Sequence, residues 1–301
     1  MTRVLFFSDT HLGLDWPSRP KVERPRHGDA LYANAERAVM RALAGDIDLV
    51  VHGGDVFHRP TVPLWVAERG YSLLKRVADR EIPVAIVPGN HERGALPFPL
   101  LARHPQIHVF DRPRTVLVRA GGTRIALGGF PHGRGVRAAF VDRLAATGLG
   151  RTSAEVSLLC AHHCFEGARV GVHEWVFRDA DDVVRGSDVP PVAAVLSGHV
   201  HRHQVLTRDL RGEPLAAPVL FSGSVERTSV AERGEPKGFL LLDFAGGRLV
   251  RWQFEELPTR PIDSAHGQAL AAHRRLAHDL ERAGRVHPLR VIQTARVDQP
   301  E

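Results

Sequence analysis

Several residue types are scarce in this chain of 301 residues, and their scarcity excludes whole classes of protein. Cys160 and Cys164 are the two cysteines, so the disulfide framework of a small secreted domain is excluded. They flank a pair of histidines, but we expect a reduced, buried pair rather than a zinc site. The apolar run Val4–Phe7 stops at Ser8, too short for a signal peptide or a membrane span. We therefore expect a cytoplasmic protein without a membrane segment.

Lysine is also scarce. Lys21, Lys75 and Lys237 are the lysines, so arginine supplies nearly all the positive charge behind the net charge of +6. Arginine favours bidentate phosphate contacts, but a codon bias toward arginine explains the preference equally well. Charge alone is therefore weak evidence for a nucleic-acid partner. With 43% hydrophobic and 25% charged residues, the composition is that of an ordinary globular protein.

Short apolar runs alternate with segments of helical spacing, which is typical of an α/β fold. The segments from Leu31 to Leu43 and from Leu64 to Val77 are expected to be helices. Gly246 and Gly247 form a turn between two strands of a β-rich second half. We expect a four-layer sandwich of two mixed β-sheets flanked by helices. The expected strands are Val4–Phe7, Ile47–Val51, Val84–Val87, Arg124–Leu127, Val156–Leu159, Ala194–Leu196, Val219–Phe221, Phe239–Leu242 and Leu249–Trp252.

Pro258 and Pro261 punctuate the chain near its end, and we place a domain boundary there. Residues 1–257 form the main domain. Residues 258–301 form a short partial cap, with a helix expected from about residue 263 to Ala283 and a strand at Leu289–Ile292. Either the chain is truncated within this cap, or the cap is rudimentary.

Five of the apolar runs end in clusters of carboxylate, imidazole or amide side chains. Asp9 and His11 lie two residues apart, which on an extended strand end places both on one side. Asp55 follows two glycines, whose tight turn can bring one carboxylate between two metal ions. The ligand types and their strand-end positions predict a site for two divalent ions. The clusters are Ser8–His11, Gly54–Asp55, Gly89–Glu92, Ala161–His163 and Gly198–His201.

Asn90 offers an amide oxygen beside His91, after a tight turn at Pro88 and Gly89. His199 and His201 can reach different ions if the bridging carboxylate lies between them. Of the adjacent histidines at 162 and 163, the first follows the strand directly, so we assign His162 as the ligand and keep His163 as the alternative.

This ordered set of motifs resembles the calcineurin-like metallophosphoesterase superfamily. Four further stretches resemble SbcD-type DNA repair nucleases, the bacterial counterparts of the eukaryotic double-strand-break repair nuclease. They are Asp9–Gly13, Gly53–His58, Gly198–Gln204, and Gly223–Ser229 followed by Glu235–Gly238. The resemblance spans roughly residues 3 to 260.

The resemblance implies two metal ions, with Mn²⁺ expected and Mg²⁺ or others possible. Asp55 is implied as the bridging ligand. His91 matches the catalytic histidine that contacts the scissile phosphate and protonates the leaving oxygen, and His58 lies near the phosphate. The implied ligands are Asp9, His11, Asp55 and His201 for the first ion, and Asp55, Asn90, His162 and His199 for the second.

We therefore expect a Mn-dependent DNA exonuclease or endonuclease of DNA repair, in which a hydroxide bridging the two ions attacks the phosphodiester. The alternatives are a nucleotide or small-molecule phosphodiesterase or phosphatase of the same superfamily, and a metal-bearing binding module. Family partners are DNA, an SbcC-type ATPase and a second copy of the chain. The ATPase is in doubt because most of the family's C-terminal region is absent.

Weak candidates for DNA contact lie in a proline-rich basic stretch and in a later turn, although the stretch can equally be a solvated insertion. They are Arg19, Lys21, Arg24 and Arg26 in the stretch and Arg134 in the turn, with Arg137 nearby.

Overall fold

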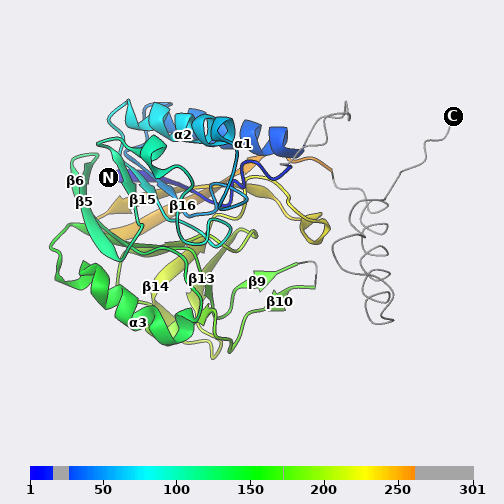
Figure 1. The fold of residues 1–301 in the computed structure, drawn as a ribbon. Coiled ribbons are helices and arrows are strands. Elements are labelled where there is room, and N and C mark those ends of the chain that lie inside the picture. The colour runs from blue at the N-terminus through cyan, green and yellow to red at the C-terminus, as the bar shows by residue number, and fades with distance from the viewer. Residues whose placement is uncertain (16–26, 172, 262–301) are drawn as a thin grey trace, which may run out of the picture. The chain divides into compact units, whose positions relative to one another are not determined.

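The fold is known from a computed structural model that describes residues 1–15, 27–171 and 173–261 (Figure 1). Within these residues the main features are two six-stranded sheets that face each other. The first has the order β16-β15-β1-β2-β3-β4 and the second β13-β14-β12-β7-β6-β5. Both are mixed: β1 to β4 run parallel, whereas β15 and β16 join antiparallel. The expected pair of mixed sheets is confirmed.

The elements have the following bounds. The first sheet contains β1 (Thr2–Phe7), β2 (Leu49–His52), β3 (Val84–Ile86), β4 (Ile107–Val109), β15 (Lys237–Ala245) and β16 (Arg248–Leu257). The second contains β5 (Arg114–Ala120), β6 (Thr123–Gly129), β7 (Val156–Ala161), β12 (Ala194–Ser197), β13 (Gln204–Arg208) and β14 (Pro214–Phe221). Short pairs are formed by β8 (Cys164–Phe165) with β11 (Val183–Val184), and by β9 (Arg169–Val170) with β10 (Trp175–Val176). The helices are α1 (His27–Ala42), α2 (Leu64–Ala78) and α3 (Val136–Thr147), with 3-10 turns η1 (Pro99–Ala102), η2 (Leu149–Arg151), η3 (Gly186–Asp188) and η4 (Val230–Glu232).

Alternation along the central strands produces the layers. In β1, Leu5 and Phe7 pack toward α1 and α2, whereas Val4 and Phe6 pack into the core between the sheets. In β7, Leu158 faces that same inter-sheet core, and Leu159 packs on the side of α3. Figure 1 shows α1 and α2 covering one sheet and α3 covering the other. The order helix, sheet, sheet, helix is the expected four-layer sandwich.

All nine expected strands and both expected helices before residue 258 are present. Helix α3 was not predicted, because Val136, Phe140 and Thr147 are its buried residues and they leave no apolar stripe of helical period. Both cysteines are free and buried, as expected. The helix expected at 263–283 and the strand expected at 289–292 lie outside the described residues. Among the described residues, no helix is long and apolar enough to cross a bilayer.

The inter-sheet core should dominate stability, so we predict that Leu158→Ala lowers the free energy of unfolding by about 2 to 5 kcal/mol. Leu158 is fully buried in that core, and the variant removes apolar contacts with both sheets. Leu117→Ala is the matched control, because Leu117 is 53% exposed in β5 and should change stability by no more than about 0.5 kcal/mol. Urea unfolding measures the free energy of unfolding of both variants. Equal decreases in the two would contradict the claim that the inter-sheet core dominates stability.

Candidate metal centre

Each predicted ligand follows the carboxyl end of a strand. Asp9 and His11 follow β1, Asp55 follows β2, and Asn90 lies beyond β3 in the first sheet. From the second sheet, His162 directly follows β7, and His199 and His201 follow β12. Because the two sheets face each other, these ends converge on one cluster. The structure thus brings all seven predicted ligands together.

One group of ligand atoms gathers around His11 and His201, whose Nε2 atoms lie 3.0 Å apart. Oδ1 of Asp9 lies 3.7 Å from His201 Nε2. Oδ2 of Asp55 lies 3.8 Å from His11 Nε2. These atoms belong to the four residues predicted for the first ion.

A second group gathers around the amide oxygen of Asn90. Oδ1 of Asn90 lies 3.0 Å from His162 Nε2 and 2.7 Å from His199 Nδ1. The same Oδ2 atom of Asp55 that faces His11 lies 3.4 Å from His162 Nε2. One carboxylate oxygen therefore faces both groups, which is the arrangement that a bridging ligand requires.

The hydrogen bonds of His162 show whether this group of atoms suits a cation. Its Nδ1–H donates to the carbonyl oxygen of Gly53 over 2.8 Å, so in a neutral ring Nε2 carries a lone pair. That lone pair faces two oxygens, from Asn90 and Asp55, which are also acceptors. Ligand atoms about 2.1 Å from an ion and at right angles to each other lie about 3 Å apart, close to the separations observed. The donor set fits a divalent ion of the Mn²⁺, Mg²⁺ or Zn²⁺ type.

Burial intensifies the need for positive charge. Asp9, His11, Asp55 and His162 are each no more than 1% exposed. Burial raises the pKa of Asp9, and the nearby histidines 201 and 162 oppose that rise. Burial lowers the pKa of His162, but the carboxylates of Asp55 and Asp9 and the carbonyl oxygen of Gly53 together outweigh it and raise this pKa to about 9. The raised pKa of His162 indicates that positive charge is favoured within this cluster.

Backbone strain accompanies the ligands. Asp9, His11, Asp55 and His199 all have positive φ, between 44° and 80°. Such conformations cost about 1 to 3 kcal/mol each for residues other than glycine, and they concentrate at functional sites. Backbone amides hold the strained carboxylates: His91 N–H donates to Asp55 Oδ1 over 2.9 Å, and His199 N–H points at Asp9 from 3.2 Å. The strain is therefore tied to the positioning of carboxylates.

His91 and His58 lie beside the first group. The Nδ1–H of His91 donates to the carbonyl oxygen of His58 over 2.9 Å, which leaves His91 Nε2 available to a ligand. The His91 ring centroid lies 4.6 Å from that of His11 and 4.7 Å from that of His58. Burial, with the charges of His91 and Arg59, lowers the pKa of His58 to about 4. Both histidines thus lie beside the group of ligand atoms around His11 and His201.

Two other histidines near these motifs, His163 and His203, make their ring contacts with residues other than the predicted ligands. His163 is buried and its ring stacks on His132, with centroids 4.9 Å apart. His203 donates from Nδ1 to the carbonyl oxygen of Phe221 and stacks on Phe254. His162, rather than His163, therefore contacts the predicted ligands.

The two cysteines do not contribute to the cluster chemistry. Burial raises the pKa of the thiols of Cys160 and Cys164 to about 12. Since the thiolate is the form that attacks a substrate or binds a metal, these thiols are poor nucleophiles and poor metal ligands.

Sequence reasoning missed two supporting carboxylates. Glu92 is buried and accepts hydrogen bonds from Phe57 N–H and Gly89 N–H, each over 2.8 Å, so it ties together the loops after β2 and β3. Glu232 accepts from His201 Nδ1 over 3.1 Å. Glu92 stands in a predicted cluster but was given no role, and Glu232 lies between two of the motifs that carry the family resemblance. Both carboxylates act by contacting other loops or side chains, and the spacing of residues in the sequence does not reveal such contacts.

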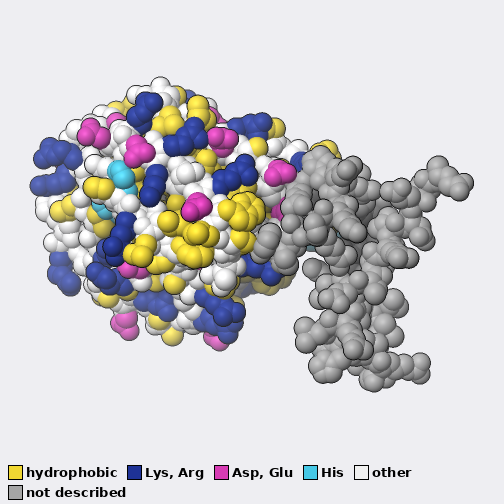
Figure 2. Space-filling model, turned by 45° about the horizontal axis from the view of Figure 1, so that its top comes forward, with side chains coloured by type: hydrophobic (Ala, Val, Ile, Leu, Met, Phe, Trp, Pro, Cys, Tyr) yellow, Lys and Arg dark blue, Asp and Glu magenta, His cyan; other side chains and the backbone are white. Residues whose placement is uncertain are grey.

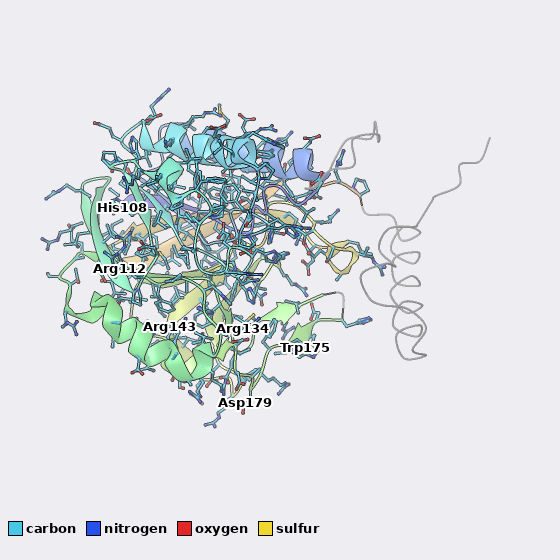
Figure 3. The ribbon with its side chains drawn as sticks, viewed as in Figure 1. His108, Arg112, Arg134, Arg143, Trp175 and Asp179 are labelled. Atoms are coloured by element: carbon cyan, nitrogen blue, oxygen red, sulfur yellow. The ribbon has the colours of Figure 1, made fainter. Side chains whose placement is uncertain are left out.

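The predicted DNA contacts are only partly within the described residues. Arg19, Lys21, Arg24 and Arg26 lie outside them. Arg134 is exposed in the turn before α3 and is labelled in Figure 3. Two residues earlier, His132 lies near the cluster, with its ring centroid 5.7 Å from that of His199. Arg137 pairs with Glu166 and Asp179, so its charge is already compensated.

Positive charge is not concentrated on the face shown in Figure 2. Lysine and arginine side chains are spread over that face, with acidic and apolar side chains between them. The net charge of +6 therefore does not by itself mark a track for DNA.

Gly89 offers a direct test of the cluster. A Cβ atom at this position would lie 2.1 Å from Oδ1 and 2.6 Å from the backbone nitrogen of Asp55, so Gly89→Ala must displace Asp55. We predict that the variant folds but binds Mn²⁺ about tenfold or more weakly by calorimetry, since misplaced ligands lose affinity on that scale. Gly150→Ala is the control, because no heavy atom lies within 4 Å of its added Cβ. Equal affinities in the two variants would contradict the assignment of Asp55.

Comparison with known proteins agrees with this geometry. DNA double-strand break repair protein Mre11 of Haloferax volcanii is 32% identical over 266 residues, which cover 87% of this chain and 54% of that protein. The protein of the same name from Aeropyrum pernix is 25% identical over 277 residues, which cover 87% of this chain and 62% of that protein. The chain thus spans a little over half the length of these relatives.

A family model, that of the calcineurin-like phosphoesterases, matches residues 2–203. The match includes more than half of the chain and extends from β1 to just beyond His201, so every predicted ligand lies within it. The chain belongs to the calcineurin-like phosphoesterase family.

Proposed function

We propose that this protein is a Mn²⁺-dependent DNA nuclease that hydrolyses phosphodiester bonds at a two-metal site. The single observation that supports this most strongly is the shared oxygen of Asp55, which faces both groups of ligand atoms while His91 stands beside them. Separate ligand groups joined by one carboxylate suit a pair of ions, and paired ions suit phosphodiester hydrolysis.

Asp9, His11, Asp55 and His201 would hold the first ion. Asp55, Asn90, His162 and His199 would hold the second. When bound, two divalent ions activate water as a nucleophile near neutral pH and neutralise the charge of the phosphate. The protein contributes the fixed positions of these ligands and a largely buried floor beneath the substrate.

His91 would act on the leaving group. Its Nδ1–H is occupied by the carbonyl oxygen of His58, so Nε2 is the atom that faces the substrate. A proton on Nε2 can be donated to the departing oxygen, and the carbonyl of His58 stabilises the imidazolium before that transfer. His58 would keep this ring aligned and approach the phosphate itself.

DNA is favoured over smaller substrates by the relatives, which are named as DNA double-strand break repair proteins. The motifs around Gly223 and Glu235, which resemble the DNA repair branch, point the same way. The alternative is a phosphodiesterase or phosphatase for nucleotides or other small molecules. It would replace our proposal if cyclic nucleotides or bis-p-nitrophenyl phosphate were cleaved while DNA was not.

We predict that His91→Ala lowers the rate of DNA cleavage by about 10² to 10⁴ fold, because it removes the side chain that is proposed to protonate the leaving oxygen. Mn²⁺ binding should stay intact, because His91 is not one of the proposed ligands. The backbone N–H of His91, which holds Asp55, remains in the variant. Asp55→Asn should abolish both cleavage and binding of two ions, and EDTA should abolish cleavage by the wild type. Single-stranded, blunt and hairpin oligonucleotides are the substrates.

His104→Ala is the matched control for this series, because His104 pairs with Asp79 before β4, outside the cluster. The cleavage rate of His104→Ala should equal that of the wild type. If DNA is the substrate, the cleavage rate of the wild type should also fall steeply as the salt concentration rises. DNA cleavage that persists in Asp55→Asn would overturn the two-metal proposal.

Partners and a domain division are also proposed from the family resemblance. The partners are an SbcC-type ATPase and a second copy of the chain. The division has a main domain of residues 1–257 and a partial cap of residues 258–301, and the proposed location is cytoplasmic. Large apolar side chains are exposed at the start of α2 and in η1. Leu64 and Leu100, 50% and 64% exposed, are candidates for the dimer contact.

A further inference from the structure

The segment of residues 222–237, between β14 and the start of β15, crosses from the second sheet to the first and contacts ligands of one ion only. It includes Gly223–Ser229 and most of Glu235–Gly238, two motifs to which the proposed chemistry gives no role. Lys237, the first residue of β15, ends the segment. Its contacts show what it does for the site.

Glu232 lies at the centre of the segment and is hydrogen-bonded on both oxygens. Its Oε1 accepts from His201 Nδ1 over 3.1 Å, from Thr228 Oγ1 over 2.7 Å and from Ser229 Oγ over 3.0 Å. Its Oε2 accepts from Thr228 N–H over 3.2 Å and lies 2.8 Å from Lys237 Nζ. A carboxylate held at this many points has a fixed orientation, and it fixes the imidazole that it contacts.

Lys237 contacts both Glu232 and the backbone of His201. Its side chain is fully buried, and its Nζ donates to the carbonyl oxygen of His201 over 2.7 Å and to Glu235 Oε2 over 3.1 Å. With the contact to Glu232, all three protons of the ammonium group have acceptors. Lys237 therefore holds both the backbone of His201 and the carboxylate that orients its ring.

The same segment also reaches Asp9, which with His11 and His201 belongs to the first ion alone. Ser222 Oγ lies 2.9 Å from Ser8 Oγ, and Ser8 Oγ donates to Asp9 Oδ2 over 2.5 Å. Ser224 N–H donates to the carbonyl oxygen of His201 over 3.1 Å. Asp9 and His201 are thus both supported from residues 222–237.

Ligands of the second ion are supported from elsewhere in the described structure. His162 Nδ1–H donates to Gly53 in the loop after β2. Asp55, which serves both ions, is held by the backbone of His91. The side-chain supports of the two ligand groups thus differ, although the backbone N–H of His199 also donates to Asp9.

We propose that Glu232 and Lys237 are positioning residues that set the affinity of the first metal position separately from the second. The Glu232 carboxylate accepts the Nδ1–H of a neutral His201, which directs the Nε2 lone pair at the ion and makes that nitrogen a better donor. Lys237 keeps the carboxylate in place and limits the negative charge of the surroundings. This inference rests on the two-metal site of the proposed function, but not on the identity of the substrate.

A purely structural role for the Glu232, Glu235 and Lys237 group is the competing account. Buried ion pairs are weak sources of stability, because the cost of removing charges from water offsets their attraction. A group kept only for stability would leave both metal positions equally affected by its loss. The two accounts therefore differ in what a metal titration measures.

The test uses the full chain and Mn²⁺ as the probe. In Glu232→Gln, calorimetry should show one of two Mn²⁺ affinities reduced by about 10 to 100 fold and the other unchanged, the scale found when partners of metal ligands are removed. At low Mn²⁺, electron paramagnetic resonance should change from the signal of a coupled pair to the six-line signal of isolated ions. Lys237→Met should show the same pattern.

Glu235→Gln is the matched control, because Glu235 contacts Lys237 but not His201. It should keep both affinities within about threefold of the wild type, well below the effect of losing a ligand's partner. If Glu232→Gln fails to fold, Thr228→Val replaces it. This substitution of similar shape removes the hydroxyl that contacts both Glu232 Oε1 and His201 Nδ1.

Loss of thermal stability in Glu232→Gln with both Mn²⁺ affinities unchanged, or with both reduced equally, would overturn the inference. Failure of the proposed function is separate, since it would appear as a wild type that binds two Mn²⁺ ions but does not cut DNA.

Discussion

Negative charge buried at the edge of two sheets is the constraint on which the rest of this structure depends. Asp9 and Asp55 are almost fully buried, and the effective cost of removing a charge from water is several kcal/mol per group. Backbone amides of His91 and His199 offset part of that cost, and the surrounding imidazoles offset more. Positive charge, from a protonated imidazole or a bound cation, is still favoured among these convergent nitrogen and oxygen atoms. The fold in this region therefore holds two buried carboxylates together with the groups that compensate their negative charge.

Both sheets contribute to both groups of ligand atoms. Asp9 and His11 come from the first sheet and His201 from the second, while Asn90 and His162 meet in the same crossed way. The spacing of ligand atoms therefore depends on how the sheets pack. A rigid apolar core between them is what fixes that spacing, so stability and metal geometry have a common origin.

Much of this could be predicted from sequence, because strand ends carry a local signal. An apolar run that stops at Asp9 or at Asp55 reveals both the strand and the edge where its side chain lies. The choice of His162 over His163 also followed from its place directly after β7. The left-handed backbone of His11 and His199 could not be predicted, since it exists only when tertiary contacts enforce it. Nor could the partnership of Glu232 with His201, which joins side chains from two different loops.

The position of β15 in the first sheet has a consequence for how the protein is made. β1 pairs with β2 on one side and with β15 on the other, although β15 begins 230 residues after β1 ends. During synthesis, Asp9 and His11 leave the ribosome early, whereas β15, which pairs with β1 and begins at Lys237, emerges much later. Long-range pairing of this kind forms slowly and late. A nascent chain would thus carry most of the proposed ligands before the group around His11 and His201 has its full support, which comes only with completion of the sheet.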